Sequence, residues 1–325
     1  MHSDIPLRTL PPEAAHQLVT AAGKLLADHG GTTGPELFAS LGEAARQLHS
    51  TTRDRFRAQF TDAGMFVVRG LPVDDEEIGP TPLHWSRAED AGALWDVVLL
   101  LVVHLMGRPL AWEGQQSGRI VNNIVPSEGH EHEQTGASST VLLSPHTEDA
   151  FHPQRAHLLL LCCMRNHDRV ATTAASVRRT GIGDEDLARL TMPVLPILPD
   201  DAYESVPGFH EAPPPVRTLW DSPEGLTLRF DPAYTPLDRA DQAHRDAYRR
   251  LEEQLAAASV EAVLEPGDVL VVDNDVVVHG RVPFRARYDG TDRWLKRALV
   301  RVPARDTRPP SEQYEHGYGQ SAIEM

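Results

Sequence analysis

The chain is most constrained by a series of short, β-branched segments that starts near residue 115 and continues to residue 302. Glycine, proline, asparagine or aspartate separates these segments, and such residues make turns. Many short strands with turns at this spacing are typical of a β-sandwich or barrel. The segments expected as strands are 119–125, 139–143, 157–163, 171–177, 216–219, 226–231, 268–272, 276–279 and 295–302.

Before residue 115 the pattern is helical. Apolar residues recur at helical spacing over 12–26, 35–48 and 83–105, and one β-branched stretch at 64–68 predicts a short strand. A further helix is expected at 238–258, where alternating charges indicate a face exposed to water.

Neither a linker nor an internal repeat divides the sequence, which therefore predicts one domain over residues 1–325. Its fold class is mainly β with flanking helices. We expect a helical N-terminal layer with one short strand over 1–115 and a β-core over 116–302 that contains the helical insert 238–258. A polar tail, 303–325, follows.

The charge balance excludes two classes of partner. The 31 Lys and Arg residues against 47 Asp and Glu residues give a net charge of −16. Nucleic-acid binding needs a basic face, and an anionic membrane surface repels an acidic protein. The most apolar stretch, 97–106, is too short to span a bilayer. We expect no nucleic-acid or membrane partner, and the sequence does not indicate an oligomeric state.

The two cysteines are adjacent, at Cys162 and Cys163. Neighbouring side chains on a strand point to opposite faces, so these two are badly placed to form a disulfide with each other. No disulfide framework and no N-terminal targeting segment are seen, which favours the cytoplasm.

Most of the 16 histidines need only ordinary explanations. The acidic, histidine-containing stretch 128–133 lies between turn residues and favours a mobile surface loop. His146 and Glu148 are different, because they lie two residues apart at a strand end. Period two places both side chains on one face, where they can supply two neighbouring ligands to a divalent metal.

His279 is the best candidate for a third ligand. It ends an apolar strand pair that turns at residues 273–275, and a β-core can bring it beside His146. Two histidines and one carboxylate with open positions form the facial triad of non-haem Fe(II) oxygenases. An ordinary His/Glu ion pair on a strand remains an alternative interpretation.

Two arginines strengthen the metal interpretation. Arg293 and Arg297 are four apart at the start of the last expected strand, and this even spacing turns both side chains the same way. A guanidinium binds a carboxylate with two parallel hydrogen bonds. Two such groups near an iron site suit a dicarboxylic cosubstrate and a carboxylate-bearing substrate, although surface salt bridges are the alternative.

Four stretches carry a family resemblance: 146–153 (His-Thr-Glu-Asp-Ala-Phe-His-Pro), 171–177 (Ala-Thr-Thr-Ala-Ala-Ser-Val), 265–274 (Glu-Pro-Gly-Asp-Val-Leu-Val-Val-Asp-Asn) and 289–295 (Asp-Gly-Thr-Asp-Arg-Trp-Leu). In combination they resemble clavaminate synthase, and more closely the asparagine and arginine hydroxylases of peptide-antibiotic pathways. The resemblance spans roughly residues 64–302. It implies a double-stranded β-helix (jelly-roll) core with Fe(II), 2-oxoglutarate and O₂ as cofactor and cosubstrates.

The resemblance also implies roles for individual residues. His146, Glu148 and His279 would bind Fe(II), and Arg293, helped by Thr172, would hold the distal carboxylate of 2-oxoglutarate. One departure is Pro145, which stands where a large residue is usual and restricts the strand before His146.

On the substrate side, the resemblance implies that Arg297 holds the α-carboxylate of an amino acid and that Asp231 recognises its side chain. Gln115 or Gln116 would approach the α-amino group. Residues 128–139 would form a lid, in which Ser138 is a further candidate for contact with the substrate.

The expected activity is hydroxylation, at Cβ, of a free polar L-amino acid in antibiotic metabolism, arginine-like before asparagine-like. Glu148 argues against a halogenase, in which a small residue replaces the carboxylate. Desaturation or ring closure, reactions of relatives, is an alternative. A zinc hydrolase would use the same triad but gives no reason for Arg293, and a non-catalytic jelly-roll binding protein would need neither.

Overall fold

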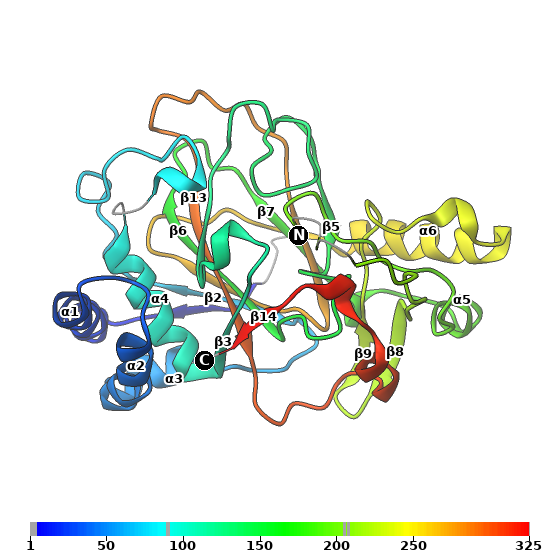
Figure 1. Cartoon of the computed structure of the whole chain (residues 1–325), viewed down its shortest axis with the longest axis horizontal. Coiled ribbons are helices and arrows are strands. Elements are labelled where there is room, and N and C mark those ends of the chain that lie inside the picture. Colours follow the sequence, from blue (N-terminus) through cyan, green and yellow to red (C-terminus); the bar gives the residue numbers. More distant parts are fainter. Residues whose placement is uncertain (1–4, 89–91, 204–205, 207–208, 325) are drawn as a thin grey trace.

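The computed structural model describes residues 5–88, 92–203, 206 and 209–324. Two β-sheets pack face to face, and a layer of N-terminal helices covers the outer side of the larger sheet (Figure 1). The larger sheet has the order β1–β2–β11–β6–β13–β3–β14, with β4 also paired to β13. Its strands are β1 Leu7–Thr9, β2 Met65–Arg69, β3 Arg108–Trp112, β4 Val121–Ile124, β6 Leu158–Arg165, β11 Val269–Asp273, β13 Trp294–Arg301 and β14 Ala322–Glu324.

The smaller sheet has the order β10–β7–β12–β5. Its strands are β5 Leu143–His146, β7 Thr172–Ser176, β10 Val260–Ala262 and β12 Val277–Arg281, and a separate hairpin pairs β8 Leu219–Ser222 with β9 Gly225–Leu228. The described part of the chain is therefore mainly β-sheet with flanking helices, as the sequence predicts.

The side chains of strand β6 pack alternately into two hydrophobic cores, one on each face of the larger sheet. Leu160 and Cys162 face the N-terminal helices, whereas Leu161 and Cys163 face the smaller sheet. Both cysteines are buried and free, so the prediction of opposite faces is confirmed. A continuous apolar run is expected for a strand that is buried on both sides.

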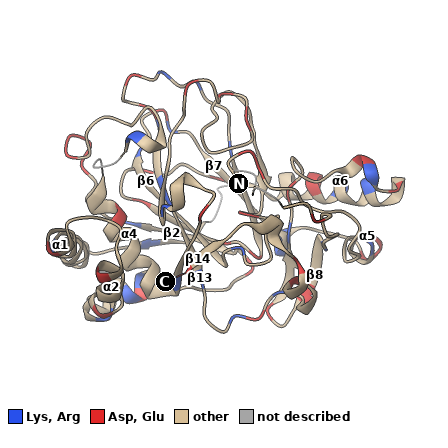
Figure 2. Cartoon of the chain, in the orientation of Figure 1, with Lys and Arg blue, Asp and Glu red and all other residues tan. Residues whose placement is uncertain are grey.

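The helices follow their sequence signals. The six α-helices of the described residues are α1 Pro12–His29, α2 Pro35–Gln47, α3 Ser50–Arg55, α4 Ala93–Met106, α5 Asp184–Leu190 and α6 Gln242–Ala257. Helix α1 begins with a proline and ends at Gly30, whose φ of 68° suits a left-handed C-cap. Helix α4 is apolar on all sides because it lies between α1, α2 and the larger sheet. Figure 2 shows charges of both signs on α6, whose other face is buried.

Several expected boundaries were wrong. The helix expected at 83–105 begins only at Ala93, because Gly92 is left-handed with φ 72°; residues 89–91 of that prediction lie outside the described part. Strand β5 occupies Leu143–His146 rather than 139–143. The segment 216–219 contributes an isolated bridge at Val216 before β8 begins.

Among the described residues before 115 there are three strands and not the single one expected. The three residues of β1 become a strand only by pairing in parallel with β2, and β3 pairs with β13 and with the C-terminal β14. Neither pairing leaves a local sequence signal, since the partners are distant in the chain. No helix among the described residues has the length and apolarity needed to cross a membrane.

Candidate active site

The smaller sheet brings the three expected metal ligands together. His146 is the last residue of β5, and the antiparallel register pairs it directly with His279 on β12. Glu148 follows two residues later, and one ligand atom from each residue lies within 4.8 Å of the others. Nε2 of His279 is 3.2 Å from Oε2 of Glu148, and the two imidazole centroids are 4.5 Å apart.

Neighbouring groups fix the orientation of these ligands. Nδ1 of His146 lies 2.8 Å from the carbonyl oxygen of Ser144, which leaves its Nε2 free to face the centre. Burial alone would raise the pKa of Glu148, but the charge of Arg297 and the hydrogen bond with His279 outweigh it and lower that pKa to about 2. Glu148 is therefore an anion, and two imidazoles with one carboxylate fit a divalent metal such as Fe(II).

A positive end of the pocket is built around Arg293. This buried guanidinium donates to Oγ1 of Thr172 at 2.9 Å, its Nε has no partner among the described residues, and no carboxylate of the described chain pairs with it. Burial lowers the pKa of Arg293 to about 10. A buried cation without an anion is costly, so this end suits an anionic ligand.

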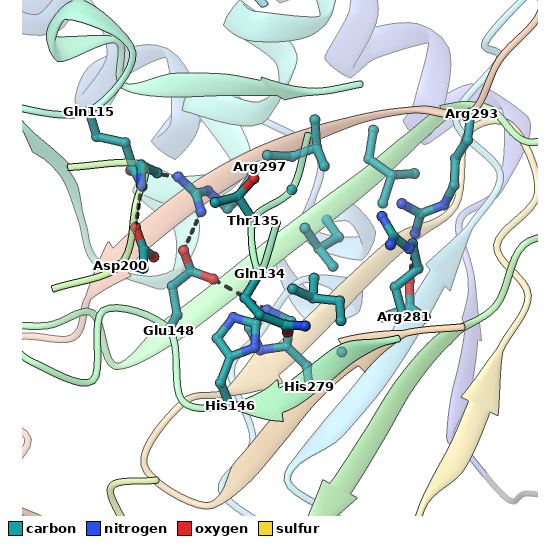
Figure 3. Close-up of a pocket in the computed structure, with 18 residues that line it drawn as sticks. Gln115, Gln134, Thr135, His146, Glu148, Asp200, His279, Arg281, Arg293 and Arg297 are labelled. Carbon is teal, nitrogen blue, oxygen red and sulfur yellow. Dashed lines mark hydrogen bonds and ion pairs between the residues drawn. The ribbon is translucent and has the colours of Figure 1, made fainter. Parts of the chain in front are cut away.

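Arg281 lies beside Arg293 at the same end (Figure 3). Its guanidinium donates to the carbonyl oxygens of Ser138 and Val141, which lie in and after the expected lid. Burial, followed by the charge of Arg293, lowers the pKa of Arg281 to about 9. Sequence reasoning did not single out Arg281, although its position two residues after His279 on the same strand places it on the ligand face.

Arg297 occupies the other end of the pocket. It donates to Glu148, to Oε1 of Gln115 at 2.5 Å and to Oδ1 of Asn122 at 2.7 Å. The side chains of Leu295 and Arg297 on β13, and of Arg293 directly before it, all line the pocket, in agreement with their even spacing.

The sequence leaves open whether Gln115 or Gln116 points into the site, and the two side chains differ in the structure. Gln115 lines the pocket and contacts Arg297. The amide of Gln116 instead pairs with the backbone of Asn123, donating to its carbonyl oxygen at 2.9 Å and accepting from its N–H at 3.0 Å. Gln116 has a φ of 46°, so the backbone turns at this residue and sends the two side chains apart.

Carboxyl groups gather at the Arg297 end. Asp200 lines the pocket, and burial together with the charge of Asp149 raises its pKa to about 8. Asp231 is buried near His146 but does not line the pocket, and its Oδ1 accepts from the N–H groups of Ala233 and Tyr234 at 3.1 and 3.3 Å. Burial raises the pKa of Asp231 to about 6. Asp200 had no sequence signal, because it lies in a loop outside every predicted element.

The expected lid closes one side of the site. Gln134, Thr135 and Gly136 line the pocket, which has a cavity of about 80 Å³. Ser138 is buried below them, where its hydroxyl donates to the carbonyl oxygen of Thr135 at 2.8 Å, and it does not line the cavity. A second cavity of about 370 Å³ shares Gln115 and Arg297 with this pocket, and Gln116 also lines it.

Comparison with known proteins agrees with this geometry. Residues 202–299 match the model of the taurine catabolism dioxygenase TauD, TfdA family. Enduracididine beta-hydroxylase of Streptomyces hygroscopicus is 38% identical over 274 residues, which cover 77% of this chain and 79% of that protein.

Two solved proteins are similar in structure. The non-heme iron oxygenase OrfP in complex with Fe and alpha-ketoglutaric acid superposes with a TM-score of 0.82 at 37% identity, covering 91% of this chain and 94% of OrfP. Its complex with Fe, succinate and (3S)-hydroxy-L-Arg gives 0.81 at 36%, with the same coverage. Asparagine oxygenase with Fe(II), 2S,3S-3-hydroxyasparagine and succinate gives 0.82 at 32%, covering 90% and 93%.

The fold and the triad thus define a non-haem oxygenase, and the chain belongs to the TauD/TfdA family of dioxygenases. Within it, the chain is similar to amino-acid hydroxylases such as enduracididine beta-hydroxylase and asparagine oxygenase.

Proposed function

We propose that this protein is an Fe(II)- and 2-oxoglutarate-dependent hydroxylase of a free, arginine-like L-amino acid, acting at Cβ. The observation that carries the proposal is the polarity of the pocket. A buried arginine that pairs with no described carboxylate lies at one end, the buried carboxyl group of Asp200 lies at the other, and three metal-binding side chains lie between them (Figure 3).

His146, Glu148 and His279 hold the iron through two imidazoles and one carboxylate. When bound, iron together with 2-oxoglutarate and O₂ supplies the oxidising chemistry that hydroxylates an unactivated C–H bond and releases succinate and CO₂. The protein contributes the geometry of the ligands and a buried site that excludes water.

Arg293 holds the distal carboxylate of 2-oxoglutarate through its paired N–H groups, and the hydroxyl of Thr172 assists. OrfP, which has 37% identity to this chain, has been solved with Fe and alpha-ketoglutaric acid. The charge of Arg281 in the same end of the pocket adds to the attraction for the dianion.

The substrate spans the opposite end. Arg297 binds the α-carboxylate, Gln115 accepts from the α-amino group, and Asp200 with Asp231 receives the cationic side chain. Carboxylates favour a guanidinium over a neutral amide, which places arginine before asparagine. Holding both ends directs one carbon toward the metal. OrfP was solved with (3S)-hydroxy-L-Arg, and enduracididine beta-hydroxylase also bears an amino-acid name.

We infer that the two facing sheets are a jelly-roll core in one oxygenase domain, as in the family. A role in antibiotic metabolism is supported by the relatives' substrates, whereas cytoplasmic location, the absence of nucleic-acid and membrane partners, and the lid role of 128–139 stay predictions of the sequence. Desaturation or cyclisation would use this same site.

The test is succinate formation from Fe(II), ascorbate, O₂ and 2-oxoglutarate across the L-amino acids, citrulline, ornithine and homologues. We expect arginine or a close analogue to trigger succinate release with a product 16 mass units heavier. A product 2 mass units lighter would replace hydroxylation by desaturation. Failure to bind 2-oxoglutarate in the presence of iron would disprove the assignment, and a zinc hydrolase would give no succinate.

A further inference from the structure

The backbone of Glu148 is held by a single buried amide. Oδ1 of Asn274 accepts from the N–H of Glu148 at 2.8 Å, and Nδ2 donates back to the carbonyl oxygen of Glu148 at 3.0 Å. The same Nδ2 donates to the carbonyl oxygen of Ala156 at 3.0 Å. Asn274 is fully buried, so no water competes for these bonds, and its position fixes the backbone that carries the metal-binding carboxylate.

Asn274 is the first residue of the turn between β11 and β12, and both of its neighbours in the chain, Asp273 and Asp275, are buried acids. Asp273 and Asp275 have side chains only 2% and 0% exposed. The backbone N–H of Asp275 donates to Oδ1 of Asp273 at 3.1 Å, so the two carboxylates lie close together. Buried like charges repel each other and destabilise this turn unless cations compensate them.

The compensating groups come mainly from the C-terminal tail. Arg305 donates to both oxygens of Asp273, at 2.9 and 2.8 Å. Arg308 donates to Oδ1 of Asp275 through Nε at 3.1 Å and Nη2 at 3.0 Å, and the hydroxyl of Thr307 donates to Oδ2 at 2.8 Å. Of the described core residues, only Arg155 adds a cation to Asp275, at 4.0 Å.

Arg308 also reaches the Asn274 network directly. Its Nη2 donates at 2.8 Å to the carbonyl oxygen of Ala156, which accepts from Asn274 as well. The tail therefore contacts the acids on both sides of Asn274. It also contacts one of the three backbone groups that the Asn274 side chain binds. These residues lie about 30 positions after the turn in the sequence, in the segment that the sequence shows only as a polar tail.

We propose that residues 305–308 of the C-terminal tail are positioning residues for the metal centre, because they hold the 273–275 turn in the conformation in which Asn274 fixes Glu148. The inference rests on the proposed function, since it assumes that Glu148 binds the metal. It assigns to the tail a role in catalysis that does not require contact with the substrate.

The test compares Arg305→Gln and Arg308→Gln with Glu315→Gln in the full-length protein. Glu315 is a matched control, because it also joins the tail to the core through a buried ion pair, with Arg229, but has no bond to the turn. The probe is Co(II) alone under anaerobic conditions, with the dissociation constant and the visible absorption bands as readouts. Thermal unfolding of the metal-free proteins is measured in parallel.

We expect the two arginine variants to weaken Co(II) binding by about tenfold to a hundredfold, the range typical of residues that orient metal ligands. Their absorption bands should change, whereas Glu315→Gln should retain wild-type affinity and bands even if it melts earlier. Asn274→Leu should reproduce the loss, and Arg308→Lys, which keeps the charge, should recover part of it.

Wild-type affinity in Arg305→Gln and Arg308→Gln would overturn the positioning role, as would an equal loss in Glu315→Gln. Unchanged Co(II) binding in Asn274→Leu would show that Asn274 does not connect the tail to Glu148. If the wild-type protein itself binds no Co(II), the proposed function fails rather than this inference alone.

Discussion

The two ends of the pocket use arginine in opposite ways. Arg293 is buried with a hydroxyl partner and has no acid partner among the described residues. Arg297, four residues later, contacts Glu148 and Gln115 and is close to several carboxyl groups. The first arginine needs an anion from outside the protein. The second belongs to a region that already has an excess of acid.

From this difference we propose which ligand binds at each end of the pocket. A dianionic keto acid is stabilised at the Arg293 end and repelled by the acids at the other end. A cationic amino acid would be stabilised near Asp200, which lines the pocket, with Asp231 buried behind it, and it would be repelled near Arg293 and Arg281. The polarity of one pocket thus sorts two carboxylate-bearing molecules into separate positions.

The largest effect is expected from Arg293→Gln, which removes the charge of the positive end. The KM for 2-oxoglutarate should rise about a hundredfold or more, equivalent to about 3 kcal/mol, because a buried ion pair with the ligand is lost. Steady-state kinetics with varied 2-oxoglutarate measures this, and Co(II) binding should not change. Arg293→Lys keeps the charge but not the paired N–H groups, so its KM for 2-oxoglutarate should lie between those of the wild type and Arg293→Gln. An arginine KM that rises as much as the keto-acid KM would contradict the separation of the two ends.

A smaller effect, about tenfold to a hundredfold, is expected from Asp200→Asn at the acidic end. The variant should lose kcat/KM for arginine while the KM for 2-oxoglutarate stays constant, because one charged hydrogen bond to the substrate is weakened. For citrulline, the neutral analogue, the variant should lose less of its kcat/KM than for arginine. Equal losses for both substrates would remove Asp200 from side-chain recognition.

The same residue should give the wild-type protein a pH dependence. Burial and Asp149 raise the pKa of Asp200 to about 8, so its carboxyl group is neutral below that pH and must ionise to pair with a cation. The KM for arginine should therefore fall as the pH rises toward 8 and level off above it.

The folded state also holds a proton on Asp200 that the unfolded state releases near pH 4, so this group makes the free energy of unfolding decline as the pH rises from about 4 to about 8. Asp200→Asn should flatten both profiles.

The smallest effect is expected from Thr172→Val at the positive end. The change removes one hydroxyl from Arg293 while it keeps the shape of the side chain, and a single hydrogen bond contributes about 1 kcal/mol. The KM for 2-oxoglutarate should rise about fivefold with no change in the KM for arginine. A double variant with Arg293→Gln should add nothing further, since the hydroxyl acts through that arginine.

Several parts of the site could be predicted because they depend only on local geometry. His146 and Glu148 are two residues apart at the end of β5, and Arg293 and Arg297 are four apart at the start of β13. Both pairs line the same pocket, although Glu148 and Arg293 lie just outside their strands. The approach of His279 needed a β-core and a family resemblance, because nothing local in the chain specifies which distant strand pairs with β5.

Other parts could not be predicted from the residues. The amide of Gln116 turns to a backbone partner that only the fold brings near, so the choice between Gln115 and Gln116 stayed open in the sequence. Asp200 lies in an irregular loop, and Asn274 resembles any turn asparagine until its amide is seen to hold Glu148.

The sequence by itself determined the local features: mainly short strands, opposite faces for Cys162 and Cys163, and the types of residue that can bind a metal and two carboxylates. The tertiary structure decided which of those residues meet, because hydrogen-bond partners such as Asn274 and Glu148 are 126 positions apart. It also decided the charge of the site, because burial raises the pKa of Asp200 and the fold places no described carboxylate against Arg293. Distance in the chain carries no information about burial, and burial sets what each charged group in this pocket can bind.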